Sequence, residues 1–123
     1  MKKILVLILF FNFSNVVASE LTTNFTIEAF DEAQKNGKTV VVYSWNKYCG
    51  TCAKQKPILN QAKKDFNDIL FLNYEQTKHK DIAKLLNINY WSTIAVYKNN
   101  KQVSAAIGLY KKGDIYSLIK EGI

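Results

Sequence analysis

Runs of consecutive apolar residues mark three predicted strands in this chain. They are Thr39–Tyr43, Asp68–Tyr74 and Thr93–Tyr97. Their apolar residues do not alternate with polar ones, which is typical of strands buried on both faces. A fourth strand, Gln102–Ile107, follows the turn dipeptide Asn99–Asn100 and predicts a hairpin. Because Val103, Ala105 and Ile107 alternate along it, we expect their side chains to meet the core.

Segments with helical spacing of apolar residues separate these strands. They run from Thr26 to about Asn36, from Cys49 or Gly50 to about Phe66, from about Lys80 to Leu86, and from Asp114 to Glu121. Thr26 is a suitable N-cap, Gly37 ends the first helix, and Asn87 is a plausible left-handed stop for the third. The element order predicts an α/β fold with a central mixed sheet of about four strands flanked by helices. Strands separated by a helix should pair in parallel, and the hairpin should add an antiparallel edge.

The N-terminus has the pattern of a secretory signal peptide. Met1–Lys3 is basic, Ile4–Phe11 is apolar, and Val16–Ala18 has small or modest side chains where a peptidase cuts. A retained membrane anchor is the alternative, but the apolar stretch is shorter than the roughly 20 residues that span a bilayer. We therefore expect a signal peptide at 1–18 and one domain at 19–123. The mature protein should be soluble in an oxidising, extracytoplasmic compartment such as the periplasm.

Composition narrows the class of partner. Without residues 1–18 the chain keeps 105 of its 123 residues and 15 of its 17 basic residues, against 10 acidic ones, a net charge of +5. All the basic residues are scattered lysines, whereas a nucleic-acid binder usually clusters them and uses arginine. We therefore expect no nucleic-acid partner. A single domain of this size is expected to be a monomer.

The candidate chemistry lies in one short motif. Both cysteines of the chain, Cys49 and Cys52, follow an apolar strand and stand at the start of a predicted helix. Two thiols at this spacing can close a small disulfide ring, and the helix N-terminus favours a thiolate on the first. A strand, a C-x-x-C motif and a helix are the arrangement that thiol–disulfide exchange needs.

From Phe25 to Ile119 the chain resembles the thioredoxin-fold family. The family's active-site pattern is a strand, Trp, three residues, C-x-x-C and a Pro five residues later, and Trp45, Cys49, Cys52 and Pro57 reproduce it. The resemblance implies a thiol–disulfide oxidoreductase that needs no cofactor and acts on protein thiols and disulfides. A membrane electron donor or acceptor would reset the cysteine pair. The direct entry into the first helix resembles short secreted members, which lack an extra first strand.

Two departures from the family pattern stand out. Ser92 occupies the position where the family usually has a cis-proline facing the cysteines. A cis bond before another residue costs roughly 3 kcal/mol, so we expect a trans bond or a strained loop. Tyr43 and Phe71 occupy the positions of a buried Asp–Lys pair of cytosolic thioredoxins. Both members of the pair are absent together, so no single buried charge is left without its partner.

The resemblance and the motif together assign roles. Cys49 is the exposed nucleophile and Cys52 the buried thiol that resolves the mixed disulfide. Substrate binding or tuning of the thiols is assigned to Trp45, Tyr48, Gly50, Thr51, Trp91, Ser92 and Thr93, whereas Pro57 is structural. Tyr48 and Trp91 are as consistent with an apolar groove as with ordinary packing, and Trp45 is favoured as a core residue. The direction of electron flow stays open, with reductant favoured over oxidant because no His lies between the cysteines.

Two other functions remain open. The two thiolates could carry Cu(I), although no Met or His in the motif completes such a site. The protein could instead be a binding or folding-assistance module with a structural disulfide. A ring this short constrains the unfolded chain little and is a poor staple.

Overall fold

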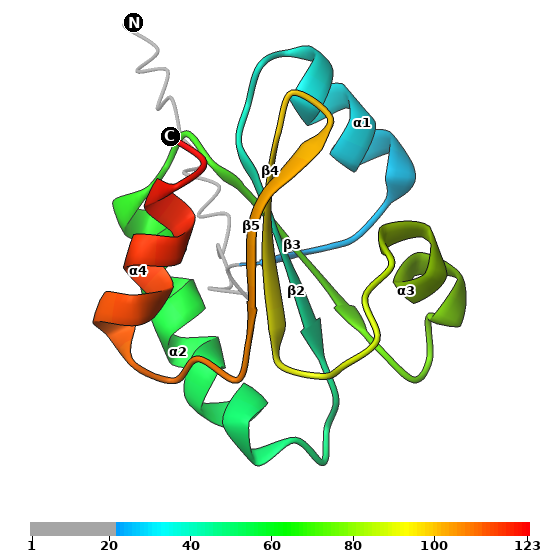
Figure 1. Cartoon of the computed structure of the whole chain (residues 1–123), viewed down its shortest axis with the longest axis vertical. Helices are drawn as coiled ribbons and strands as arrows, with labels where there is room; N and C mark the ends of the chain where they lie inside the picture. The colour runs from blue at the N-terminus through cyan, green and yellow to red at the C-terminus, as the bar shows by residue number, and fades with distance from the viewer. Residues whose placement is uncertain (1–21) are drawn as a thin grey trace, which may run out of the picture.

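The computed structural model describes residues 22–123, which form a five-stranded sheet with two helices on each face (Figure 1). The strands lie in the order β1-β3-β2-β4-β5. Their bounds are Thr23–Asn24 (β1), Val40–Trp45 (β2), Leu70–Glu75 (β3), Thr93–Lys98 (β4) and Lys101–Ile107 (β5). The helices are Ile27–Lys35 (α1), Gly50–Asp65 (α2), Lys80–Leu86 (α3) and Lys112–Lys120 (α4).

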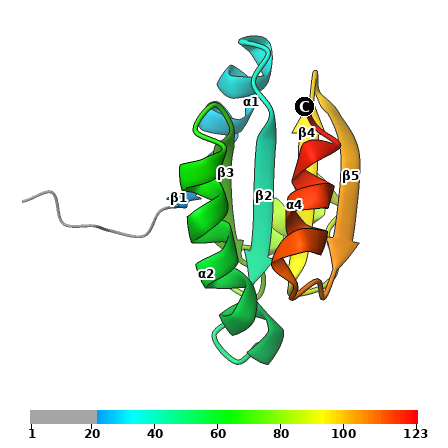
Figure 2. The ribbon, with the colours of Figure 1, turned by 90° about the vertical axis from the view of Figure 1, so that its left-hand side faces the viewer.

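The central strands bury both faces, which explains their unbroken apolar sequence. α2 and α4 cover one face and α1 and α3 the other, as Figures 1 and 2 show from two directions. Along β2, Val40 and Val42 pack toward α1 and α3, whereas Val41 and Tyr43 pack toward α2 and α4. The predicted α/β fold with a mixed sheet is confirmed.

Several local predictions are also confirmed. The Thr26 hydroxyl accepts a hydrogen bond from the Ala29 N–H at 3.2 Å and caps α1. Asn87 ends α3 in the left-handed conformation, with φ 54°. The hairpin turn has positive φ at both Asn99 and Asn100, as a type I′ turn requires.

The pairing of the strands departs from the prediction in two ways. β2 pairs in parallel with β3 but antiparallel with β4, so the rule that helix-separated strands pair in parallel is wrong for β4. A strand also precedes α1, because β1 pairs in parallel with β3 through Thr23 and Asn24. The expectation of about four strands without an initial strand is therefore corrected to five.

β5 also departs from the prediction, because its alternating apolar residues face solvent. Ala105 is exposed, and so are Val103 (42%) and Ile107 (57%), so these residues do not face the core. The intervening residues are half-buried, and the Ser104 hydroxyl donates to the Leu118 carbonyl of α4 at 3.0 Å. β5 is an edge strand, and among the described residues α4 packs on one of its faces while neither α1 nor α3 extends over the other.

The predicted signal peptide, residues 1–18, lies outside the described residues. Within residues 22–123, none of the helices combines the length and the apolar character that a membrane crossing needs.

Candidate active site at the start of α2

β2 is the central strand, and the two cysteines follow its C-terminal end, at the start of α2. Cys49 is the N-cap residue, and its sulfur accepts a hydrogen bond from the Cys52 N–H at 3.1 Å. The two sulfurs form a disulfide, with the Cα atoms 5.2 Å apart. Cys49 is half-buried, whereas Cys52 is 4% exposed and packs in the core beneath α2. Cys49 is therefore the more accessible of the two cysteines.

Asn46 shapes the loop between β2 and α2. Its carbonyl accepts from the Cys49 N–H at 3.1 Å, and its side-chain oxygen accepts from the Tyr48 N–H at 2.9 Å. Its amide group donates to the Thr77 hydroxyl after β3 at 2.8 Å. These bonds tie the loop to itself and to the neighbouring strand end, so Cys49 starts α2 from a defined position.

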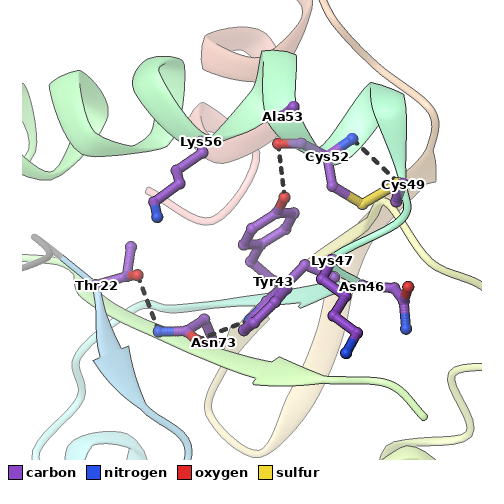
Figure 3. Close-up of a pocket in the computed structure, with 10 residues that line it drawn as sticks. Thr22, Tyr43, Asn46, Lys47, Cys49, Cys52, Ala53, Lys56 and Asn73 are labelled. Atoms are coloured by element: carbon purple, nitrogen blue, oxygen red, sulfur yellow. Dashed lines mark hydrogen bonds between the residues drawn. A yellow bond between two sulfur atoms is a disulfide. The ribbon is translucent and has the colours of Figure 1, made fainter.

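A cavity of about 210 Å³ lies behind the disulfide (Figure 3). It is lined by Thr22, Tyr43, Trp45, Asn46, Lys47, Cys49, Cys52, Ala53, Lys56 and Asn73. Among residues 22–123, the lining contains two lysines and no carboxylate. Lys56 extends from α2 along this cavity, one helical turn after Cys52 (Figure 3).

Tyr43 takes the place of a buried acid beneath the disulfide. Its hydroxyl donates to the Cys52 carbonyl at 2.9 Å rather than to a sulfur (Figure 3). Burial raises the pKa of Tyr43 well above its usual range. The phenol is therefore neutral at ordinary pH and cannot act as a base toward Cys52. Phe71, which is 1% exposed, occupies the position of the lysine of the family's Asp–Lys pair and keeps β3 apolar there.

Trp45 is anchored by a residue that the sequence analysis did not single out. Its indole N–H donates to the Asn73 side-chain oxygen at 3.0 Å. The Asn73 amide in turn donates to the Thr22 hydroxyl at 2.9 Å and the Thr23 carbonyl at 3.2 Å. An asparagine within an otherwise apolar strand was the signal for this role, since a buried amide needs partners. Half-buried Trp45 thus forms a wall of the cavity and links it to β1.

Ser92 stands in a left-handed backbone conformation beside α2. Its φ is 55°, and among residues 22–123 every peptide bond is trans, as expected for a serine at this position. Its carbonyl accepts from the Gln55 amide at 3.2 Å and from the Gly108 N–H at 3.0 Å. The same Gln55 amide donates to the Leu109 carbonyl at 2.7 Å.

Gln55 is the second residue that the sequence analysis missed. It is fully buried, and its amide group holds the loops that contain Ser92 and Leu109 against α2. Its own oxygen has no partner within the described part of the chain. A polar residue on the inner face of a helix was the only signal. Without the loops in place, nothing in the sequence indicated what it would bind.

The other predicted site residues divide between the loop and the surface. Tyr48 is 78% exposed with the Lys47 ammonium 5.1 Å from its ring centroid, and Gly50 begins α2 at the surface. Thr51 is half-buried. None of the three lines the cavity behind the disulfide.

The remaining three predicted residues follow α3 or lie within α2. Trp91 is 39% exposed and lines a separate hollow beside α3. Thr93 is buried and its hydroxyl donates to the Tyr90 carbonyl at 2.7 Å, which shapes the turn before β4. Pro57 lies inside α2 on its exposed side. Among the described residues, no group of three or more His, Cys, Asp or Glu side chains is arranged to hold a metal ion.

Comparison with known proteins agrees with this geometry. The family model described as thioredoxin matches residues 21–121. The thioredoxin of Rickettsia bellii is 25% identical over 107 residues, covering 84% of this chain and all of that protein. Thioredoxin H4-2 of Oryza sativa is 31% identical over 81 residues, covering 66% of this chain and 61% of that protein.

Solved structures resemble the fold closely. Trxlp from Edwardsiella tarda superposes with a TM-score of 0.75 at 20% identity, covering 80% of this chain and 97% of that one. Mitochondrial thioredoxin 3 of Saccharomyces cerevisiae in its oxidised form superposes with a TM-score of 0.70 at 22% identity, covering 81% and 94%.

Proposed function

The chain belongs to the thioredoxin family, with thiol–disulfide oxidoreductase activity toward protein thiols and disulfides, and we propose that it works as a reductant outside the cytoplasm through Cys49 and Cys52. The observation that carries the roles of the two cysteines is the asymmetry of the pair. Cys49 is half-buried at the N-cap of α2, and Cys52 is enclosed behind it.

The first step uses the reduced pair. The Cys49 thiolate attacks one sulfur of a substrate disulfide, so a Cys49–substrate bond forms and the other substrate sulfur leaves as a thiolate. The N-terminus of α2 and the Cys52 N–H, 3.1 Å from the Cys49 sulfur, favour the attacking thiolate.

The second step releases the substrate. Cys52 loses its proton and attacks the Cys49 sulfur, the internal disulfide forms, and the second substrate sulfur leaves as a thiolate. Two electrons have then passed to the substrate, and a dithiol partner must return them. Because no carboxylate of residues 22–123 lines the cavity behind Cys52, we assign the proton to water. The ammonium groups of Lys47 and Lys56, which line the cavity, favour the Cys52 thiolate.

Trapping of the mixed disulfide tests these roles. In Cys52→Ala the second step is absent, so we expect substrate proteins to stay covalently attached to Cys49 and to be released by a reducing agent. Cys49→Ala is the matched control and should trap none. The wild-type chain should reduce insulin with a dithiol donor, and both variants should not. Equal trapping by the two variants would contradict the assignment of Cys49 as nucleophile.

The reduction potential tests the direction of electron flow. No histidine lies between the cysteines, which supports a reductant. We expect a potential near about −270 mV, whereas about −120 mV would indicate an oxidant. The reduction potential of the Cys49–Cys52 pair is measured by equilibration of the purified protein in buffers with known ratios of reduced to oxidised glutathione.

The compartment is proposed from the N-terminal pattern of residues 1–18. The chain should be exported, cleaved after residue 18, monomeric, and reset by an electron donor in the membrane. A chain expressed with a C-terminal phosphatase reporter should be active outside the cytoplasm, and the mass of the exported protein should lack residues 1–18. An intact Met1 on a cytoplasmic protein would contradict export.

A further inference from the structure

The surface around the disulfide differs in charge from the rest of the molecule. We define the motif face as residues 46–56, 76–79, 89–93 and 108–112. Contacts join these segments: Asn46 bonds Thr77, and Gln55 bonds the carbonyls of Ser92 and Leu109. The motif face therefore surrounds Cys49 with parts of four loops and the first turns of α2.

All the ionised side chains on the motif face are cationic. Its lysines are exposed, and they are Lys47, Lys54, Lys56, Lys78, Lys111 and Lys112. The four segments contain no Asp or Glu. The nearest carboxylates in sequence are Glu75, which is 6% exposed and paired with Lys78 at 3.2 Å, Asp81 in the first turn of α3, and Asp114 in the first turn of α4. The other acidic residues of the described chain lie on α1, at the end of α2, in the turn before β3 and at the C-cap of α4.

Exposed aromatic rings lie among these lysines. Tyr48 is 78% exposed and Tyr110 54%. The Lys54 and Lys111 ammonium groups lie 5.5 and 5.9 Å from the centroid of the Tyr110 ring, which brings α2 and the loop before α4 together. Cation–π contacts of this kind hold lysines near a ring while leaving their charge accessible. The face thus combines apolar contact area with a positive potential.

We propose that the protein segment that exchanges its disulfide at Cys49 carries Asp or Glu side chains within a few residues of its reactive cysteine. This inference rests on the proposed function and names the substrate class of the same site. Complementary charge raises the rate of encounter and disfavours partners of like charge. The Debye length is about 8 Å at physiological ionic strength, so the selection acts on residues that immediately flank the substrate cysteine.

The test compares three synthetic peptides with one intramolecular disulfide each. The peptides are identical except for the residues flanking one cysteine, which are Asp, Ser or Lys. Reduction by the reduced wild-type protein is measured at low salt and divided by the rate with dithiothreitol, which removes intrinsic differences in reactivity. We expect a rate about tenfold higher for the Asp peptide than for the Lys peptide, falling toward equality in about 0.5 M salt.

Charge reversal locates the effect on the molecule. The double variant Lys54→Glu/Lys111→Glu should reverse the preference, so that the Lys peptide is reduced faster. The matched control Lys38→Glu/Lys101→Glu makes the same change in net charge at exposed positions near the opposite ends of β2 and β5. It should keep the wild-type preference.

Three results would overturn the inference. In the first, wild type reduces the Ser peptide but treats the Asp and Lys peptides alike, which leaves the proposed function intact. In the second, both double variants change the preference equally, so net charge and not the motif face is responsible. In the third, wild type reduces none of the peptides and no insulin, which overturns the proposed function as well.

Discussion

Substitution of Ser92 by proline, the residue that the family usually has there, should damage this protein rather than improve it. Ser92 has φ 55°, whereas the proline ring holds φ near about −65°. The segment that contains Trp91, Ser92 and Thr93 therefore has to rearrange before proline fits. Ser92 is 8% exposed, so this rearrangement takes place among packed neighbours.

The magnitude follows from the contacts that the rearrangement breaks. The Ser92 carbonyl accepts hydrogen bonds from Gln55 at 3.2 Å and Gly108 at 3.0 Å, and each is worth about 1 kcal/mol. Forced movement of a packed segment costs a further 1–3 kcal/mol, approximately. Removal of the strain of a left-handed non-glycine residue offsets about 1 kcal/mol of this loss. The free energy of unfolding should therefore fall by about 2–4 kcal/mol.

Urea unfolding of the oxidised protein measures this change. With a slope of about 2 kcal/mol per molar urea, the midpoint of Ser92→Pro should lie about 1–2 M below wild type. Ser92→Gly is the control, because glycine accepts a positive φ without strain, and its midpoint should equal or slightly exceed that of wild type. A proline variant as stable as wild type would refute the claim that the surrounding contacts require the left-handed conformation.

Three further predictions concern the core of the domain. Tyr43→Phe removes the hydrogen bond to the Cys52 carbonyl and should cost about 1 kcal/mol in urea unfolding. The rate of mixed-disulfide resolution should stay within about twofold of wild type, because the hydroxyl does not contact sulfur. A large loss of rate in stopped-flow measurements would show instead that Tyr43 takes part in the proton transfer from Cys52. Burial raises the pKa of Tyr74 and Tyr97 to about 12, above the value of about 10 in the unfolded chain. Their contribution to stability is therefore complete below pH 10 and is lost between about pH 10 and 12, at about 1.4 kcal/mol per pH unit for each tyrosine. Tyr97→Phe should lessen this dependence in urea titrations at pH 9 to 11, and an unchanged slope would contradict the assignment. Gly122→Ala places a Cβ 2.5 Å from Val96 and 2.7 Å from Thr39, so thermal unfolding should show a loss of about 1–3 kcal/mol, whereas Gly113→Ala, whose Cβ meets nothing within 4 Å, should stay close to wild type.

The local features of the fold could be predicted from the sequence because they depend on neighbouring residues. Thr26 caps α1, Asn87 ends α3, and Asn99–Asn100 turns the hairpin, each through backbone preferences of a few consecutive residues. The positions of Cys49 and Cys52 at the start of α2 followed in the same way from a strand, a short loop and a helix. The thiol–disulfide chemistry of the site could therefore be predicted from the sequence.

The environment of the cysteines was decided by contacts between distant segments. Asn73 reaches Trp45 from 28 residues away, and Gln55 reaches Leu109 from 54 residues away. A buried amide indicates that a partner exists, but its identity depends on which loops the sheet order brings to the same edge. The Ser92 conformation likewise depends on the donors that converge on its carbonyl.

The direction of β4 and the exposure of β5 also could not be predicted from the sequence. An apolar run predicts burial but not whether β4 lies parallel or antiparallel to β2, because either pairing satisfies the backbone hydrogen bonds and buries the same side chains. The alternation along β5 predicted that one face is apolar, yet only the arrangement of the helices determined that Val103 and Ile107 face solvent. The sequence by itself determined the elements and the reactive pair. The tertiary structure decided what surrounds that pair, since burial and charge at a surface arise from segments that meet only after folding.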